Sequence, residues 1–220
     1  MNKWLYENLF YLTSDKTRIQ KLVEHYEIYK RISKLNGDII ECGVFKGVSL
    51  IRFLTFRDFD KTSKIKKIYG FDAFGSFPTP ATDKIHKIRD TNIAKLHDKK
   101  IGLGINIKKL DNVLKKKGFK NYQLIKGDVT KTIDFFVANK KDLKISLLHL
   151  DMDIYEPTKH TLNKLFKFII KNGIILIDDY KHIKGATVAI DEFLKENKKL
   201  HIQKLSSSSR PSFIIKNKLI

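Results

Sequence analysis

Cysteine, tryptophan and proline are scarce in this sequence, and long apolar runs are absent. The single cysteine, Cys42, excludes an internal disulfide and is typical of a reducing cytoplasm, the localisation that we expect. No apolar stretch reaches the ~20 residues that a membrane-spanning helix needs. Residues 1–8 lack the apolar core and small-residue cleavage site of a signal peptide. With 220 residues, no internal repeat and no linker between domains, the chain is expected to form one globular domain with a small extension.

Arginine is also scarce for so basic a chain. The 44 basic residues against 24 acidic ones give a net charge of +20, yet 38 of the 44 are lysine. Recognition of phosphates and bases favours arginine, because its guanidinium group makes paired hydrogen bonds. The lysines are spread along the sequence in short groups such as residues 115–117. We interpret them as a solvated surface and expect no nucleic acid partner; an RNA- or polyanion-binding protein is the alternative suggested by the charge.

Short apolar runs alternate with segments of helical periodicity, which predicts an α/β fold with a mostly parallel sheet. A helix over residues 14–35, capped by Ser14 or Asp15, belongs to an N-terminal extension, residues 1–37. The main domain spans residues 38–220 and ends in an antiparallel hairpin across a serine-rich loop. Residues 78–104 have the least regular pattern and are expected to form a lid, with His86 and His97 facing solvent or lying behind the site. The predicted strands are 38–42, 68–72, 122–126, 144–150, 174–177, 200–205 and 212–216.

Carboxylates follow two of these strands at the point where each apolar run stops. Asp151 and Asp153 come after strand 144–150, and Asp178 and Asp179 come directly after strand 174–177. If the two strands are neighbours, all four side chains meet at the edge of the sheet where α/β proteins bind ligands. Four like charges are unfavourable unless a cation lies among them, and oxygen donors favour Mg²⁺ or another hard cation. The alternative is that the four aspartates only cap strand ends.

The first half of the chain has the elements of a nucleotide pocket. A glycine turn, residues 43–47, joins strand 38–42 to a helix, as in nucleotide-binding βαβ units. Asp72 ends the second strand, where an acid commonly binds ribose hydroxyls, although it would also suit a turn or an N-cap. Asp128 follows the third strand and suits either a base amino group or the cap of the next helix. Since the P-loop pattern is absent, ATP is not the expected donor.

These residues lie in motifs that resemble the macrocin O-methyltransferase family, metal-dependent sugar O-methyltransferases of macrolide and aminocoumarin biosynthesis. The resemblance runs from about residue 38 to residue 194. It is carried by Glu41-Cys42-Gly43-Val44-Phe45-Lys46-Gly47, Phe71-Asp72-Ala73-Phe74-Gly75-Ser76-Phe77-Pro78, His149-Leu150-Asp151-Met152-Asp153-Ile154-Tyr155-Glu156-Pro157-Thr158, Asp178-Asp179-Tyr180, Gly185 and Ala189-Ile190-Asp191-Glu192-Phe193. It implies a Rossmann-like class I methyltransferase fold, with a seven-stranded sheet whose last strand is reversed.

The resemblance also implies roles for individual residues. Asp151, Asp178 and Asp179 would bind Mg²⁺, and Asp153 would be the general base. The cofactor S-adenosyl-L-methionine would be bound by a set in which Glu41 and Gly43 line its methionine part, Asp72 holds its ribose and Asp128 approaches its adenine. The full set of cofactor-binding residues implied by the resemblance is Glu41, Gly43, Gly47, Ser49, Asp72 and Asp128. A homodimer with residues 1–35 at the contact is consistent with the resemblance.

The expected function is transfer of a methyl group to a hydroxyl of a sugar or sugar-containing small molecule. Two other hypotheses remain open at this stage. One is RNA or polyanion binding on a methyltransferase fold, and the other is O-methylation of a catechol-type small molecule. The sequence does not name the acceptor.

Overall fold

The computed structural model describes residues 2–60, 66–78, 84–205 and 210–217. Helices and strands alternate along most of the chain, as the apolar periodicity predicts. The elements are α1 (Lys3–Thr13), α2 (Lys16–Ile32), β1 (Asp38–Cys42), α3 (Val48–Phe59), β2 (Ile68–Asp72), α4 (Lys84–Lys100), α5 (Ile107–Lys116), β3 (Tyr122–Lys126), α6 (Val129–Ala138), β4 (Ile145–Leu150), α7 (Tyr155–Leu165), the 3₁₀ turn η1 (Phe166–Phe168), β5 (Ile169–Ile177), α8 (Lys184–Glu196), β6 (Gln203–Lys204) and β7 (Ser212–Ile215).

One seven-stranded sheet forms the centre, in the order β3-β2-β1-β4-β5-β7-β6. The first five strands in this order are parallel, while β7 is antiparallel to both β5 and β6. The predicted fold class, with its antiparallel C-terminal edge, is therefore confirmed. The serines at residues 206–209, expected to be the hairpin loop, lie outside the described residues.

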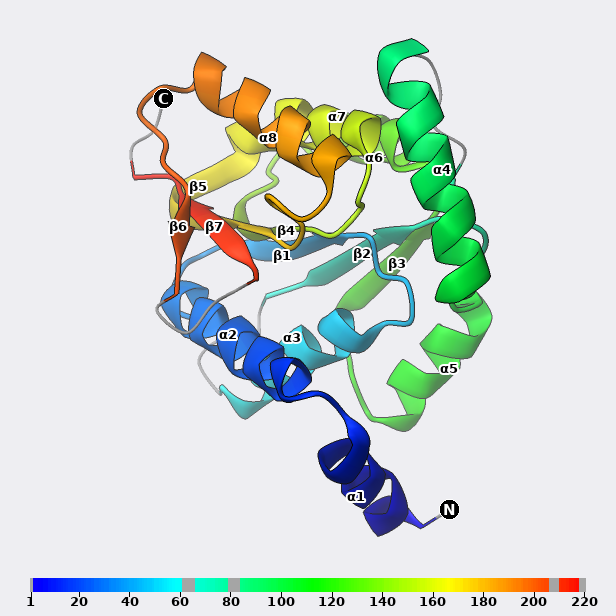
Figure 1. The fold of residues 1–220 in the computed structure, drawn as a ribbon. Helices are drawn as coiled ribbons and strands as arrows, with labels where there is room; N and C mark the ends of the chain where they lie inside the picture. Colours follow the sequence, from blue (N-terminus) through cyan, green and yellow to red (C-terminus); the bar gives the residue numbers. More distant parts are fainter. Residues whose placement is uncertain (1, 61–65, 79–83, 206–209, 218–220) are drawn as a thin grey trace.

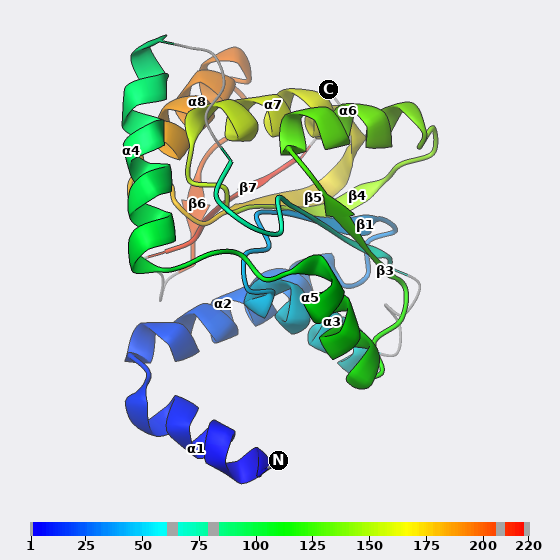
Figure 2. The ribbon, with the colours of Figure 1, turned by 90° about the vertical axis from the view of Figure 1, so that its right-hand side faces the viewer.

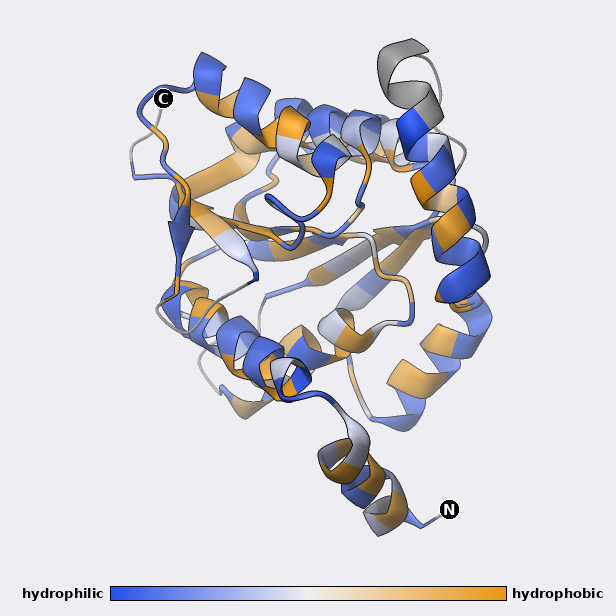
Figure 3. Ribbon diagram, viewed as in Figure 1, coloured by the Kyte–Doolittle hydropathy of each residue, from blue (hydrophilic) through white to orange (hydrophobic). Residues whose placement is uncertain are grey.

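Helices cover both faces of the sheet. Figures 1 and 2 show α2, α3 and α5 on one side and α6, α7 and α8 on the other, with α1 projecting away from the body. Successive strand residues enter opposite layers: Ile39 packs with α2 and α3, whereas Ile40 packs with α6 and α7. Hydrophobic residues follow the central strands, and hydrophilic residues dominate the outer faces of α2 and α8 (Figure 3). No helix in the described ranges is both long and apolar enough to cross a membrane.

The N-terminal extension contains more structure than predicted. Two helices, α1 and α2, replace the single helix expected over residues 14–35, and Asp15 caps α2 by accepting from the Thr17 amide. α2 belongs to the core, because Ile28 and Ile32 are fully buried against the sheet layer. By contrast, α1 leaves apolar side chains such as Trp4 and Leu12 exposed. That helix lacks the buried stripe on which helix prediction depends.

The segment expected to be irregular, residues 78–104, contains the helix α4. That part of the prediction was wrong. α4 has only four large apolar residues among its 17, and the flanking Pro78, Pro80, Gly102 and Gly104 suggested a loop. The helix is fixed by its contacts instead: Asp90 is buried, and its carboxylate accepts from the Tyr155 amide at the start of α7, 2.9 Å away.

Candidate active site

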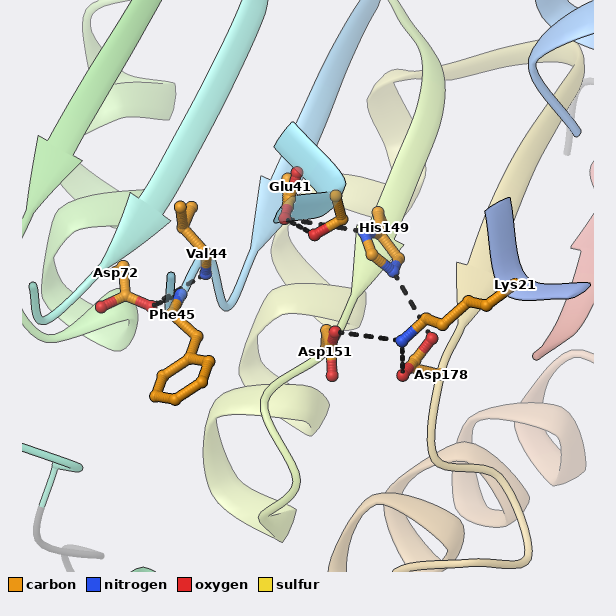
Figure 4. A network of polar contacts seen from close by, with 9 residues as sticks. Lys21, Glu41, Val44, Phe45, Asp72, His149, Asp151 and Asp178 are labelled. Atoms are coloured by element: carbon orange, nitrogen blue, oxygen red, sulfur yellow. Dashed lines mark hydrogen bonds and ion pairs between the residues drawn. The ribbon is translucent and has the colours of Figure 1, made fainter. Parts of the chain in front are cut away.

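The turn after β1 is held by the acid that ends β2. The amides of Val44 and Phe45 donate to Asp72 Oδ2 at 2.8 and 2.9 Å, as Figure 4 shows, and the Phe74 amide donates to Oδ1 at 2.6 Å. Gly43 begins this turn with a φ of +94°. Asp72 therefore fixes the path of the glycine turn, while its remaining lone pairs still face the neighbouring pocket.

A pocket that is partly open to solvent lies at the carboxyl ends of the parallel strands; its empty space, open solvent included, is about 1030 Å³. It extends from the end of β2 to the loop after β4, so Asp72 and Asp153 lie in one continuous wall. Its lining is mostly apolar, with a few carboxylates, which suits an organic cofactor. The residues that line it include Gly43, Phe45, Phe71, Asp72, Phe77, His97, Asp98, Asp128, Val129, Asp151, Met152 and Asp153.

The structure separates the six predicted cofactor residues into two groups. Gly43, Asp72 and Asp128 line the pocket. Glu41 and Ser49 are buried behind it, where the Ser49 hydroxyl donates to Glu41 Oε1 at 2.5 Å. Gly47, with φ of +82°, occupies the N-cap position of α3. Their cofactor roles stay predictions.

Asp128 caps a helix and also lies at the pocket, so its position is compatible with both roles that the sequence left open. Its carboxylate accepts from the Thr130 amide at 3.0 Å and caps α6. It also borders the pocket. The cap is an observed contact, and the approach to an adenine stays a prediction.

Helix α4 closes one side of the pocket, a contribution that the sequence did not indicate. His97 lies between two aromatic rings, 5.0 Å from Phe45 and 5.2 Å from Phe77 between centroids. The Phe77 amide donates to the Asp98 carboxylate at 3.2 Å. His97 thus lines the pocket, whereas we expected it to face solvent or lie behind the site; the side chain of His86 lies outside the described part.

The four strand-end aspartates come together as predicted, because β4 and β5 are neighbours. Asp151, Asp153 and Asp179 each offer a carboxylate oxygen, and these three atoms lie within 4.8 Å of one another. Asp178 is 5% exposed and faces the adjacent interior. The backbone of Asp153 is left-handed, with φ of +66°, a region that Asp and Asn enter more readily than other residues with a side chain.

Burial and mutual repulsion disfavour full ionisation of this cluster. Burial raises the pKa of Asp179 to about 8, with further contributions from the charges of Asp153 and Asp178. Burial and the charge of Asp151 raise the pKa of Asp153 to about 6. Burial, together with Asp178, also raises the pKa of Asp151. A cation among these groups would reverse the effect, because it favours the charged form of each carboxyl.

A buried polar network joins the carboxylates to Glu41. His149 Nδ1 lies 3.9 Å from Glu41 Oε1, and its Nε2 lies 3.9 Å from Asp178 Oδ1. Lys21, from α2, places Nζ 2.5 Å from Asp178 Oδ2 and 3.9 Å from Asp151 Oδ2 (Figure 4). Although burial opposes ionisation, His149 and Lys21 hold the pKa of Asp178 below its usual value. No sequence pattern distinguished Lys21, and His149 looked like one more residue of a buried strand.

The donor set fits a hard divalent cation. Asp178 Oδ1 and Asp179 Oδ2 are buried and have no hydrogen-bond partner among the described residues. Asp178 Oδ1 faces His149 Nε2, whereas Asp179 belongs to the group of converging carboxylates, so Asp179 Oδ2 is the atom that is open for a ligand. The converging donors are all oxygens, the type that Mg²⁺ prefers.

The chain matches the sequence model of a known protein family. The model of the macrocin-O-methyltransferase family matches residues 10–205, most of the chain. The protein belongs to the macrocin-O-methyltransferase family. The predicted resemblance is therefore confirmed, and the matched range includes Lys21, the glycine turn and all four aspartates.

One curated relative of this chain is distant in sequence. Demethyldecarbamoylnovobiocin O-methyltransferase of Streptomyces niveus is 26% identical over 166 residues. That alignment covers 71% of this chain and 58% of the relative, so the chain spans little more than half of the curated protein's length.

Solved structures agree with the fold of the family. A calicheamicin methyltransferase superposes with a TM-score of 0.70 at 21% identity, covering 94% of this chain and 83% of the other. The O-methyltransferase NovP gives 0.71 at 18% identity, covering 90% and 80%. At these identities the likeness establishes the fold alone.

The buried Glu41 of this family member provides a pH-dependent prediction. Burial raises its pKa from 4.5 to about 8, although the hydrogen bond from Ser49 opposes the shift. The folded protein thus retains a proton that the unfolded chain has released at neutral pH. The free energy of unfolding attributable to Glu41 therefore falls as pH rises from about 4.5 to about 8.

Glu41→Gln, which keeps an acceptor for Ser49 and cannot ionise, is expected to remove this decline. A difference of one pKa unit corresponds to ~1.4 kcal/mol, so the variant should exceed wild type by about 2 kcal/mol or more at pH 9 and match it near pH 5. Urea unfolding of both proteins at pH 5, 7 and 9 measures the difference. If the free energy of unfolding of the two proteins changed with pH in parallel, Glu41 would be ionised in the folded protein.

Proposed function

We propose that the protein is an S-adenosyl-L-methionine-dependent O-methyltransferase acting on a hydroxyl of a sugar or sugar-containing small molecule, with Mg²⁺ held by carboxylates and Asp153 as the general base. The observation that carries the proposal is the shared pocket. One cavity is lined at one end by Asp72 and Asp128 and at the other by Asp151 and Asp153. A nucleoside cofactor and an acceptor bound there would be adjacent.

The cofactor end is suited to a nucleoside with an electrophilic methyl group. S-adenosyl-L-methionine would supply that methyl group on a sulfonium centre. Asp72 is directed by the turn amides and offers lone pairs to ribose hydroxyls, and Phe71 and Val129 provide apolar wall for a base. Gly43 allows the backbone to approach the ligand closely at the centre of the pocket.

The acceptor end is suited to removing a proton from a hydroxyl. A bound divalent cation would lower the pKa of an acceptor hydroxyl. Asp151, Asp178 and Asp179 would hold the cation, since Asp151 and Asp179 belong to the converging carboxylates and Asp178 shares the Lys21 ammonium group with Asp151. Asp153 lines the pocket beside them and would accept the hydroxyl proton as the hydroxyl oxygen takes the methyl group, with S-adenosylhomocysteine as the leaving group. Fixing both partners in one pocket supplies much of the rate, because effective molarities in such arrangements reach ~10⁵ M or more.

The first test is calorimetric titration with S-adenosylhomocysteine, with and without Mg²⁺. We expect binding in the micromolar range in both conditions, because the cofactor residues are distinct from the carboxylate cluster. ATP is the control ligand and is expected not to bind. Absence of S-adenosylhomocysteine binding in either condition would refute the cofactor assignment.

The acceptor class is tested separately. Nucleotide-linked sugars and a catechol are incubated in parallel with the protein, labelled cofactor and Mg²⁺. The sugar acceptor follows from the family relationship, so methyl transfer to the sugars is expected. Transfer to the catechol alone would support the methyltransferase activity and contradict the assignment of a sugar as the acceptor.

A further inference from the structure

Lys21 places a positive charge between two carboxylates of the cluster. Its ammonium group contacts Asp178 at 2.5 Å and lies 3.9 Å from Asp151 (Figure 4). Its side chain is only 19% exposed, although it comes from a helix at the other end of the sequence. The two carboxylates that it reaches are ones to which the proposed function assigns a metal.

The ammonium group satisfies the cluster incompletely. Asp179 Oδ2 is buried and lacks a hydrogen-bond partner among the residues described, although Lys21 is present, whereas Asp178 Oδ1 faces His149 Nε2 at 3.9 Å. An ammonium carries one charge and three donors, whereas Mg²⁺ or Mn²⁺ carries two charges and accepts about six oxygen ligands. The cluster thus retains donor atoms for a cation with a higher charge than the Lys21 ammonium group.

We propose that Lys21 is a tethered counter-cation, and that a divalent metal binds to the aspartate cluster only in competition with the Lys21 ammonium group. The proposal rests on the metal site of the proposed function. In the absence of metal, Lys21 stabilises carboxylates that would otherwise repel one another. When metal binds, two cations would share Asp178 and Asp151, and their repulsion lowers the affinity for the metal.

The exchange needs movement of one side chain rather than of the helix. One turn after Lys21, His25 is fully buried and its ring stacks on Phe53, with 5.2 Å between centroids. Ile28 and Ile32 anchor the same helix in the core. The flexible four-carbon stem of Lys21 is therefore the part that withdraws, through its partly exposed side.

Lys21→Met tests the competition, because methionine fills a similar volume without charge. We expect the Kd for Mn²⁺ to fall at least tenfold relative to wild type, measured at pH 8 without cofactor from the electron paramagnetic resonance signal of free Mn²⁺. Lys21→Arg keeps the charge and should stay within threefold of wild type. Lys30→Met, an exposed lysine on the same helix, makes the same change in net charge and should also stay within threefold.

Thermal unfolding gives a second reading that does not depend on turnover. Without metal, Lys21→Met should unfold at a lower temperature than Lys30→Met, since its carboxylates have lost their counter-cation. Saturating Mg²⁺ should raise its Tm more than it raises that of wild type.

Equal Mn²⁺ affinity in wild type and Lys21→Met would overturn the proposal, and so would weaker binding by the variant, which would make Lys21 a supporting partner of the metal. Absence of Mn²⁺ binding in both proteins would overturn it too. S-adenosylhomocysteine binding is measured on each variant, so that failure of the metal inference is distinguished from failure of the methyltransferase proposal.

Discussion

Asp153→Asn is expected to lower kcat for methyl transfer about 10³-fold, within the 10²–10⁴ range typical of losing a general base. The carboxylate of Asp153 lines the pocket, and asparagine cannot accept the hydroxyl proton at that position. Asparagine tolerates the left-handed backbone at φ of +66° as well as aspartate does, so the fold should be preserved. The measurement is initial rate with an acceptor from the sugar screen, together with the Kd of S-adenosylhomocysteine, which should stay within twofold of wild type.

The matched control is Asp134→Asn, which removes a carboxylate from α6. Asp134 is 47% exposed and pairs with Lys164, away from the pocket. The initial rate of methyl transfer by Asp134→Asn should equal that of wild type. If Asp153→Asn also kept a rate within threefold of wild type, Asp153 would not be the base, and the proton would have to leave through another group.

The sheet was predictable because its central strands are short and mostly apolar. Residues of β4 and β5 are buried on both faces, which is what short apolar runs indicate. The extra length at the start of β5 was missed, since Lys171 and Asn172 interrupt its apolar pattern. α4 was missed for a related reason: it has few apolar residues, and it is held by contacts such as that of Asp90 with the start of α7.

The acidic part of the site was predictable from topology, whereas its positive part was not. The prediction that Asp151 and Asp178 meet required only that the strands before them be neighbours, which the pairing of β4 with β5 satisfies, and it needed no knowledge of side-chain positions. Lys21 reaches them from α2, and the sequence contains many other lysines with nothing to distinguish this one. His149 was hidden for a different reason, because it is a polar residue within a mostly apolar strand.

Gly43→Ala is expected to be the most damaging single substitution to the fold. A Cβ at this position would lie 1.8 Å from the backbone carbonyl oxygen of Asp151, and the φ of +94° is itself unfavourable for alanine. Backbone on both sides leaves no flexible side chain to yield. The turn after β1 and the end of β4 must therefore separate, at a cost of about 4 kcal/mol or more in the free energy of unfolding.

Substitutions at two other glycines separate the cost of backbone strain from the cost of steric overlap. Gly102 has φ of +88° with open space where a Cβ would lie, so Gly102→Ala should cost only the backbone strain, ~1–2 kcal/mol. Gly75 has neither constraint, and Gly75→Ala should change the free energy of unfolding by less than ~1 kcal/mol. Urea unfolding of the three variants gives the comparison. Because separation at Gly43 also displaces Asp151, any folded Gly43→Ala should lose S-adenosylhomocysteine and Mn²⁺ binding together; a variant that retained both would show that the turn and the carboxylate cluster are not rigidly joined.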